Sequence, residues 1–125
     1  MRFLHTSINV KDMDVTIKFY ITHLGLQLLR RVEITENNAE IAFLSNVQGE
    51  HKLELTYWRD KKDYIECDQL DHLAFEVNNL DSTILSMKKA GVEIAKEPFS
   101  LKGGEKRIAF IKDPNGIWVE LIEKV

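Results

Sequence analysis

The sequence predicts an α+β protein built from two tandem modules, each with the element order βαβββ and a curved mixed sheet. Three observations predict this class. Strand-like and helix-like periods alternate along the chain, the order of the first half starts again near residue 70, and chemically matched residues recur about 67 positions apart. We expect one domain over residues 1–125, with modules at about 1–59 and 70–125 and a polar linker at 60–69.

The first half reads as a strand, a helix and three further strands. Leu4, Ile8 and Val10 fall on one face of the opening strand, and His5 falls on the other. Asp12 offers helix N-cap chemistry, and Gly25 is a natural residue to end that helix. The expected elements are a strand at 2–10, a helix of about ten residues before Gly25, and strands at 26–34, 40–45 and 52–58.

The second half repeats this order. The stripe Leu80, Ile84 and Met87 predicts a helix that ends at Ala90 and Gly91. The remaining expected elements are strands at 70–77, 92–96, 106–112 and 117–123, with a turn at 113–116 between the last two. Because one face of each sheet carries polar residues, we expect the two sheets to curl around a shared cleft, with the helices on their apolar backs.

The composition excludes several classes of partner. Apolar residues make up 44% and charged residues 30% of the chain, the net charge is −3, and the basic residues form no block. This balance argues against nucleic acid or an anionic membrane surface as the partner. Since no apolar run approaches the roughly 20 residues needed to span a bilayer, we expect a cytoplasmic protein.

Four residues recur in matched places and point to a metal. His5 and His72 are 67 residues apart, and Glu54 and Glu120 are 66 apart. Each half thus has a histidine on its first strand and a glutamate on its last, and alternation turns all four toward the polar face. Two imidazole nitrogens and two carboxylates suit a divalent Ni, Co, Zn, Mn or Fe ion with positions left open. Taken singly, each would more often be a packed histidine or a solvated glutamate.

Several segments then resemble glyoxalase I, the lactoylglutathione lyase of the vicinal oxygen chelate superfamily. The matching segments, which span nearly the whole chain, are Met1-Arg2-Phe3-Leu4-His5-Thr6, Phe19-Tyr20, Leu24-Gly25-Leu26, Leu53-Glu54-Leu55-Thr56-Tyr57, Lys102-Gly103-Gly104, Ile108-Ala109-Phe110 and 113–122. The compact length resembles the bacterial nickel or cobalt type. The resemblance implies a metal cleft and the detoxification of methylglyoxal.

The resemblance also implies roles for the four residues. His5, Glu54, His72 and Glu120 match the metal ligands of the family, in which two chains of a homodimer share each site. The family isomerises the hemithioacetal of a 2-oxoaldehyde and a thiol to a 2-hydroxyacyl thioester through a metal-stabilised enediolate. By the same resemblance Glu120 is the base, and Glu54 is a second carboxylate for the other stereoisomer.

The substrate contacts match less completely. Lys102 of the Lys-Gly-Gly loop is retained, but Asn9 stands where the family has an arginine, and Trp58 follows Tyr57 where the family has an asparagine. Arg107 shares the face of Ala109 and Ile111, and it is either a contact for an anionic group of the substrate or an ordinary surface arginine. These departures leave the thiol open, and they also leave open a substrate that is not a thiol adduct.

Other functions on the same fold remain as alternatives. An epimerase of acyl-CoA thioesters, an extradiol dioxygenase and a thiol transferase are metalloenzymes of the same superfamily. A drug-binding module without metal is an alternative of a different class, although such proteins typically lose the ligands that this chain keeps.

Overall fold

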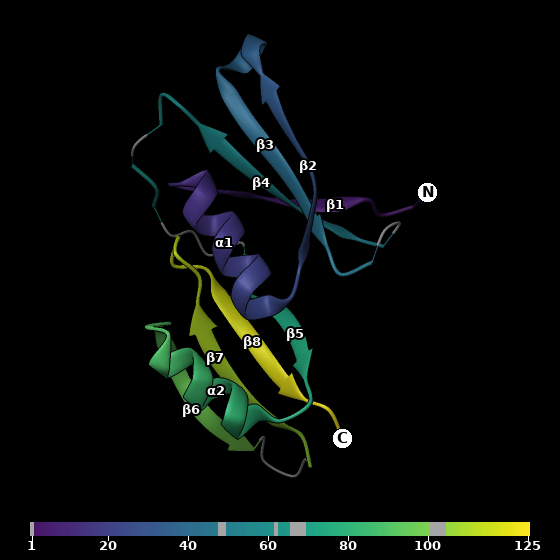
Figure 1. The fold of residues 1–125 in the computed structure, drawn as a ribbon, viewed down its shortest axis with the longest axis vertical. Coiled ribbons are helices and arrows are strands. Elements are labelled where there is room, and N and C mark those ends of the chain that lie inside the picture. Colours follow the sequence, from purple (N-terminus) through teal and green to yellow (C-terminus); the bar gives the residue numbers. More distant parts are fainter. Residues whose placement is uncertain (1, 48–49, 62, 66–69, 101–104) are drawn as a thin grey trace. The chain divides into compact units, whose positions relative to one another are not determined.

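The protein divides into two compact units, Met1–Ile65 and Glu66–Val125. The computed structural model describes all residues except 1, 48–49, 62, 66–69 and 101–104. Within the described residues each unit contains one α-helix and one four-stranded mixed sheet (Figure 1). The predicted α+β class with a repeated βαβββ order is therefore confirmed, and the unit boundary falls inside the segment expected to be a linker.

The first unit follows the predicted order. Its elements are β1 (His5–Asn9), α1 (Met13–Leu24), β2 (Gln27–Ile34), the short 3₁₀ helix η1 (Thr35–Asn37), β3 (Ala39–Ser45) and β4 (Lys52–Trp58). The strands lie in the order β1-β4-β3-β2. β1 runs parallel to β4, and the other neighbours are antiparallel. This arrangement puts the first and last strands of the unit side by side.

The second unit has the same topology. Its elements are β5 (Leu73–Val77), α2 (Leu80–Lys89), β6 (Ile94–Ser100), β7 (Arg107–Lys112) and β8 (Trp118–Glu123). The strands lie in the order β5-β8-β7-β6, again with the first pair parallel. β6 begins later and runs further than the expected strand at 92–96, and its register shifts on both sides of Lys96. Pro98 fits within it because β6 is an edge strand, where a missing N–H is tolerated.

Local chemistry fixes the ends of both helices. The Asp12 carboxylate accepts a hydrogen bond from the Val15 N–H at 2.9 Å, and Asn79 does the same for Ser82 at the start of α2. Gly25 ends α1 with φ at 68°, a left-handed conformation that costs glycine little. The helix starts and the stop at Gly25 thus follow from the residues that the sequence offers there.

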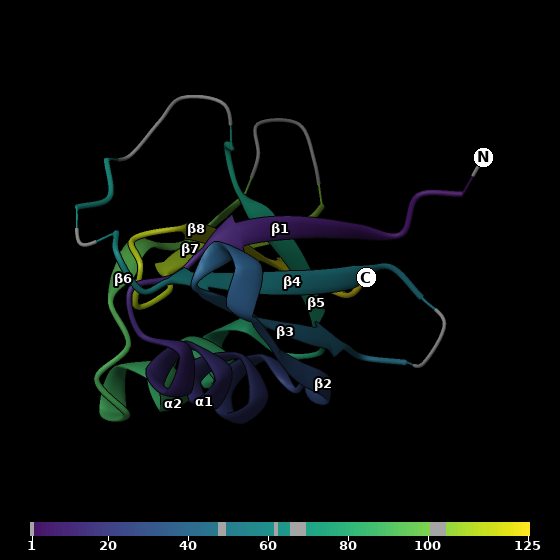
Figure 2. The same ribbon diagram turned by 90° about the horizontal axis from the view of Figure 1, so that it is seen from above.

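Each sheet has an apolar face and a polar face. In the first unit α1 lies against one face of the sheet (Figure 2). Leu44 and Leu55, on that face, are fully buried. In the second unit Ile111 and Leu121 are fully buried on the side of α2. Burying one such side chain contributes about 1.5–3 kcal/mol, so this packing determines which way every strand faces. Among the described residues, no helix is long and apolar enough to cross a membrane.

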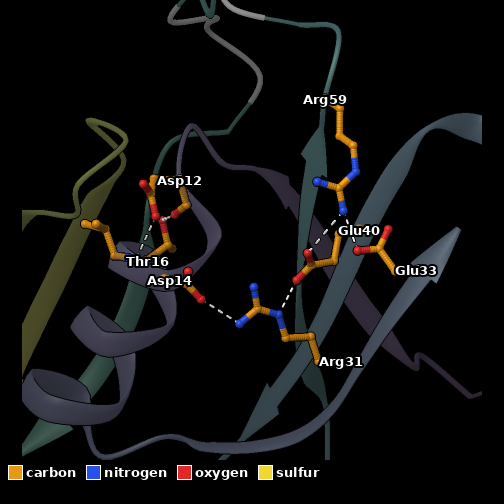
Figure 3. Close-up of polar contacts among 8 residues, drawn as sticks. Asp12, Asp14, Thr16, Arg31, Glu33, Glu40 and Arg59 are labelled. Atoms are coloured by element: carbon orange, nitrogen blue, oxygen red, sulfur yellow. Dashed lines mark hydrogen bonds and ion pairs between the residues drawn. The ribbon is translucent and has the colours of Figure 1, made fainter.

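Arginines tie the first turn of each helix to its sheet. Arg31 on β2 contacts Asp14 of α1 at 2.6 Å and also binds Glu40 of β3 (Figure 3). The hydrogen bonds to Glu40 and then to Asp14 raise the pKa of Arg31, so its charge is permanent. In the second unit Arg107 of β7 donates two hydrogen bonds to Asp81 of α2, at 2.8 and 2.9 Å. A carboxylate in the first turn also suits the helix dipole.

The Asp81 contact predicts a loss of stability in acid. The two hydrogen bonds from Arg107 hold the pKa of Asp81 below its usual value. The Asp81 carboxyl therefore binds a proton more tightly in the unfolded chain than in the folded one. The contribution of the Asp81 contact to the free energy of unfolding is complete above the unfolded pKa of about 3.9, and it is lost as the pH falls through the lower folded pKa. We expect Asp81→Asn to lower the melting temperature at pH 7, and we expect the difference from wild type to shrink below about pH 4.

Thermal unfolding followed by circular dichroism from pH 2 to pH 8 measures this effect. Glu76→Gln removes an exposed carboxylate from the same unit without touching Arg107 and is the matched control. A difference that stays constant across the whole pH range would contradict the assignment.

Candidate metal centre

The first unit brings His5 and Glu54 together on the polar face of its sheet. Across the parallel pair, His5 lies opposite Lys52 and Ser7 lies opposite Glu54, so His5 and Glu54 are diagonal neighbours. The His5 Nε2 atom lies 3.4 Å from Glu54 Oε2. The glutamate side chain is mostly buried, at 15% exposure, while that of the histidine is 40% exposed.

The second unit builds the same pair. Ala74 lies opposite Glu120 in the parallel pair of β5 and β8, and His72 comes two residues before Ala74. The His72 Nε2 atom lies 3.2 Å from Glu120 Oε2, and the Glu120 side chain is again 15% exposed. Both histidines therefore contact the glutamate of their own unit with the same geometry.

A phenylalanine completes each pair, and the sequence reasoning missed it. Phe43 lies opposite Glu54 and Phe110 lies opposite Glu120 on the neighbouring antiparallel strands. The ring of Phe43 meets that of His5 edge to face, at 5.5 Å and 72°. Phe110 meets His72 at 5.7 Å and 82°. A sequence signal did exist, because the two phenylalanines share the 67-residue spacing of the histidines.

A cation lies beside each phenylalanine, on the strand next to it and away from the glutamate. Arg30 lies opposite Phe43 with its guanidinium carbon 5.2 Å from the ring centre. Lys96 lies opposite Phe110 with its Nζ 5.7 Å from the ring centre. These contacts hold each ring in place by cation–π attraction. In both units the cross-strand neighbours therefore run from the glutamate to the phenylalanine and then to a positive charge.

The two pairs fit a divalent metal as ligands. At metal–ligand lengths of about 2.1 Å, two ligand atoms lie about 3.0 Å apart at a right angle and about 3.4 Å apart at a tetrahedral angle. The separations of 3.4 Å between His5 and Glu54 and 3.2 Å between His72 and Glu120 fall in this range. Imidazole nitrogen with carboxylate oxygen is also a donor set that Ni, Co, Zn, Mn and Fe accept.

Asp71 gives the second pair a further feature of a metal ligand. Its Oδ1 lies 2.5 Å from His72 Nδ1. When Nδ1 donates its proton to Asp71, Nε2 presents a lone pair toward the Glu120 carboxylate, and a proton or a cation must lie between them. The sequence reasoning did not single out Asp71, because it looked for the same chemistry in both halves and Leu4 is the matched residue in the first.

We expect Asp71→Asn to weaken metal binding by about tenfold or more, because the partner that orients a metal-binding histidine supports its affinity. Titration with Ni²⁺ or Co²⁺ in competition with a chelator measures the change. Asp63→Asn, at an exposed aspartate of the other unit, is the control. Equal affinities for the two variants would remove Asp71 from the site.

Of the two residues expected to bind substrate, the structure describes Arg107 but not Lys102. Arg107 shares the helix side of its sheet with Ala109 and Ile111, where Asp81 takes its guanidinium at 2.8 and 2.9 Å and Glu123 lies at 3.5 Å. The polar face that carries Glu120 is the opposite one. The role of Arg107 as a substrate contact stays a prediction, and in the structure its guanidinium binds Asp81. Lys102 lies outside the described residues.

A pocket of about 360 Å³ opens on the first unit. Asn9 and Trp58, which belong to the same strand faces as His5 and Glu54, form part of its wall, and the Trp58 indole N–H donates to Asn9 Oδ1 at 2.9 Å. The other lining residues are Asn37, Asn38, Asp60 and Lys61. Two positions at which the sequence departs from the glyoxalase I pattern, Asn9 and Trp58, therefore meet in one pocket.

In the part of the chain that the structure describes, each unit contributes one histidine–glutamate pair of potential ligands. Among the described residues, no three side chains of histidine, cysteine, aspartate or glutamate gather into a metal-binding group. Two protein ligands are fewer than the three or four that hold a catalytic metal. Within the described residues, neither pair by itself supplies that number of ligands.

The family model for the Glyoxalase/Bleomycin resistance protein/Dioxygenase superfamily matches residues 2–121. The chain belongs to this superfamily. It is 40% identical over 125 residues to a probable lactoylglutathione lyase of Vibrio cholerae, with 98% of this chain and 90% of the relative covered. It is 37% identical to a lactoylglutathione lyase of Haemophilus influenzae, with 98% and 93% covered.

Solved structures agree with these relatives. The trypanothione-dependent glyoxalase I of Leishmania major is similar with a TM-score of 0.86 and 33% identity, over 98% of this chain and 86% of that one. Glyoxalase I of Zea mays gives 0.89 and 32%, over 99% of this chain but 45% of that longer chain. The predicted resemblance to glyoxalase I is confirmed, and the relatives are enzymes, as expected for this chain.

Proposed function

We propose that the chain is a metal-dependent glyoxalase I-type lyase. It would isomerise the hemithioacetal of a 2-oxoaldehyde, such as methylglyoxal, and a thiol to a 2-hydroxyacyl thioester. The observation that carries the proposal is the repeated pair, His5 with Glu54 and His72 with Glu120, at the same register and nearly the same distance. The lactoylglutathione lyases among the relatives support the choice of reaction.

The difficult step is the removal of a weakly acidic proton from the carbon that bears sulfur. The electron pair left behind places negative charge on two adjacent oxygens, as an enediolate. A divalent ion held by His5, Glu54, His72 and Glu120 would act there as a Lewis acid that stabilises this charge. We assign Ni or Co first, in line with the compact bacterial type, and Zn, Mn or Fe suit the same ligands.

Glu120 is the proposed base. Its carboxylate would take the proton from the sulfur-bearing carbon and return one to the neighbouring carbon, so that the reaction is a net isomerisation. His72 is poorly suited to this task, because Asp71 contacts its Nδ1 and its Nε2 is aimed at Glu120. Glu54 would be the second carboxylate of the site.

A homodimer would supply the four ligands. Each unit has two, and in the proposed assembly the His5 and Glu54 pair of one copy joins the His72 and Glu120 pair of a second copy. This arrangement also explains why both pairs face the polar side of their sheets, where a partner can reach them.

The pocket beside Asn9 is the proposed site for the far end of the thiol. Glu54 and Trp58 are four residues apart on β4, which is about 13 Å along a strand. A thiol whose sulfur lies at the metal would therefore extend toward the pocket. Because Asn9 replaces an arginine of the family pattern, the proposal does not require glutathione.

The test is an assay of the purified protein with methylglyoxal and a panel of thiols, following thioester formation by absorbance. We expect activity after loading with Ni²⁺ or Co²⁺ and its loss after chelation, with recovery when metal is restored. The chelated protein is its own control. Metal binding without thioester formation from any thiol would refute the proposed reaction and favour another chemistry of the superfamily. A protein that resists metal loading would favour a binding module.

A further inference from the structure

The two glutamates of the site have different surroundings. Glu54 Oε1 accepts hydrogen bonds from the hydroxyls of Ser7, at 2.9 Å, and Thr56, at 3.1 Å. These two hydroxyls also lie 2.9 Å from each other. Glu54 Oε2 is the oxygen that lies near His5. One oxygen of this carboxylate is therefore held by the protein, and only the other faces the histidine.

Glu120 lacks this support from the described residues. Ala74 lies opposite Glu120 as Ser7 lies opposite Glu54, and Ile122 follows Glu120 by two residues as Thr56 follows Glu54. Neither alanine nor isoleucine has a side-chain donor. Of the described residues, only His72 makes a polar contact with the Glu120 carboxylate. The two units thus repeat the histidine and the glutamate, but within the described part of the chain only Glu54 has hydroxyl groups that hold its carboxylate.

We propose that Ser7, together with Thr56, is a positioning residue that fixes Glu54 in one orientation as a permanent ligand. The inference rests on the proposed function and assigns different tasks to its two carboxylates. Rotation of the Glu54 carboxylate would break both hydroxyl contacts. Glu120, which contacts no hydroxyl among the described residues, would be free to turn between the ion and the substrate carbon. The asymmetry therefore makes Glu54 the anchor and Glu120 the mobile base.

The first arm of the test removes the hydroxyl at position 7. Ser7 is exposed, so Ser7→Ala creates no cavity, and Ser7→Thr keeps a hydroxyl on a residue that suits a strand. We expect Ser7→Ala to raise the dissociation constant for Ni²⁺ about tenfold, measured against a chelator, because it removes support for a ligand. With saturating Ni²⁺, kcat should stay within about twofold of wild type. Ser7→Thr should restore wild-type affinity.

The second arm adds a hydroxyl to the other unit. Ala74 is exposed and holds the matched position, so Ala74→Ser has room to offer Glu120 the hydrogen bond that Ser7 gives Glu54. We expect kcat to fall about tenfold at saturating Ni²⁺, with no rise in the dissociation constant, because the base is restrained while the ligand is supported. A merely structural effect would not weaken only Ni²⁺ affinity in Ser7→Ala and lower only kcat in Ala74→Ser.

The contrary outcomes separate this inference from the proposed function. If the wild-type protein does not bind metal, the proposed function fails, and the inference fails with it. If the wild type binds metal and turns over but Ser7→Ala leaves the dissociation constant unchanged, only the inference is overturned. Loss of kcat in Ser7→Ala at saturating Ni²⁺ with unchanged affinity would also overturn it, since Glu54 would then be the base.

Discussion

Replacing Glu120 with glutamine is expected to lower kcat by about 10²–10⁴-fold, the usual contribution of a general base. Glutamine keeps the shape of the side chain and an oxygen that can bind metal, but it cannot accept the substrate proton. We therefore expect some metal to remain bound. Measuring kcat with methylglyoxal and a thiol, beside the metal content of the same sample, tests both parts.

Glu76→Gln is the control for this variant. Glu76 lies on β5, on the same face of the second unit as Glu120, but its place in the register is opposite Ile122. It should leave kcat and metal content unchanged. Full activity of Glu120→Gln would refute Glu120 as the base.

Mixing two inactive variants is expected to restore activity if two copies share each site. In a dimer of His5→Ala with Glu120→Gln, one site carries both changes and the other carries none. Random exchange makes about half of the dimers mixed, and half of their sites are intact, so about a quarter of wild-type activity should return. The variants are purified separately and then exchanged by unfolding and refolding together, or they are co-expressed with different tags.

The matched control mixes two variants that are each changed in the first unit, His5→Ala and Glu54→Gln. Here every site of every dimer carries a lesion, so mixing should restore nothing. If His5→Ala and Glu120→Gln also failed to complement each other while each remained folded, each site would belong to a single chain. That result would contradict the shared site but would leave the ligands themselves in place.

The ligand pairs were accessible from the sequence because strand alternation is a strict local rule. It placed His5 and Glu54 on one face without any tertiary information, and the 67-residue repeat then supplied the second pair. The order of strands and helices along the chain, and the helix ends, followed from similar local signals. The role of the four residues as metal ligands stays a prediction.

Other parts of the site depend on geometry that alternation does not describe. Phe43 joins His5 because a neighbouring strand brings it into the same row, which requires the pairing register. Asp71 reaches His72 although adjacent residues of a regular strand point to opposite faces, because both precede β5. Such contacts become visible only once the backbone is known.

Arg107 shows how a correct placement can leave a role undetermined. The sequence put it on the face of Ala109 and Ile111, and the structure agrees. That face is the one covered by α2, and Asp81 in the first turn of the helix binds the guanidinium. The partner could not be predicted, because it depends on how the helix lies over the sheet.

The histidine, phenylalanine and glutamate of each trio lie within a single unit, and this has an evolutionary consequence. Two copies joined end to end would retain every trio, so gene fusion can change the number of chains without altering the chemistry. If two copies share each site, as proposed, a linker would replace the encounter of two molecules by an effective concentration in the millimolar range. Activity would then survive dilution, and the two halves of the fused chain could diverge independently.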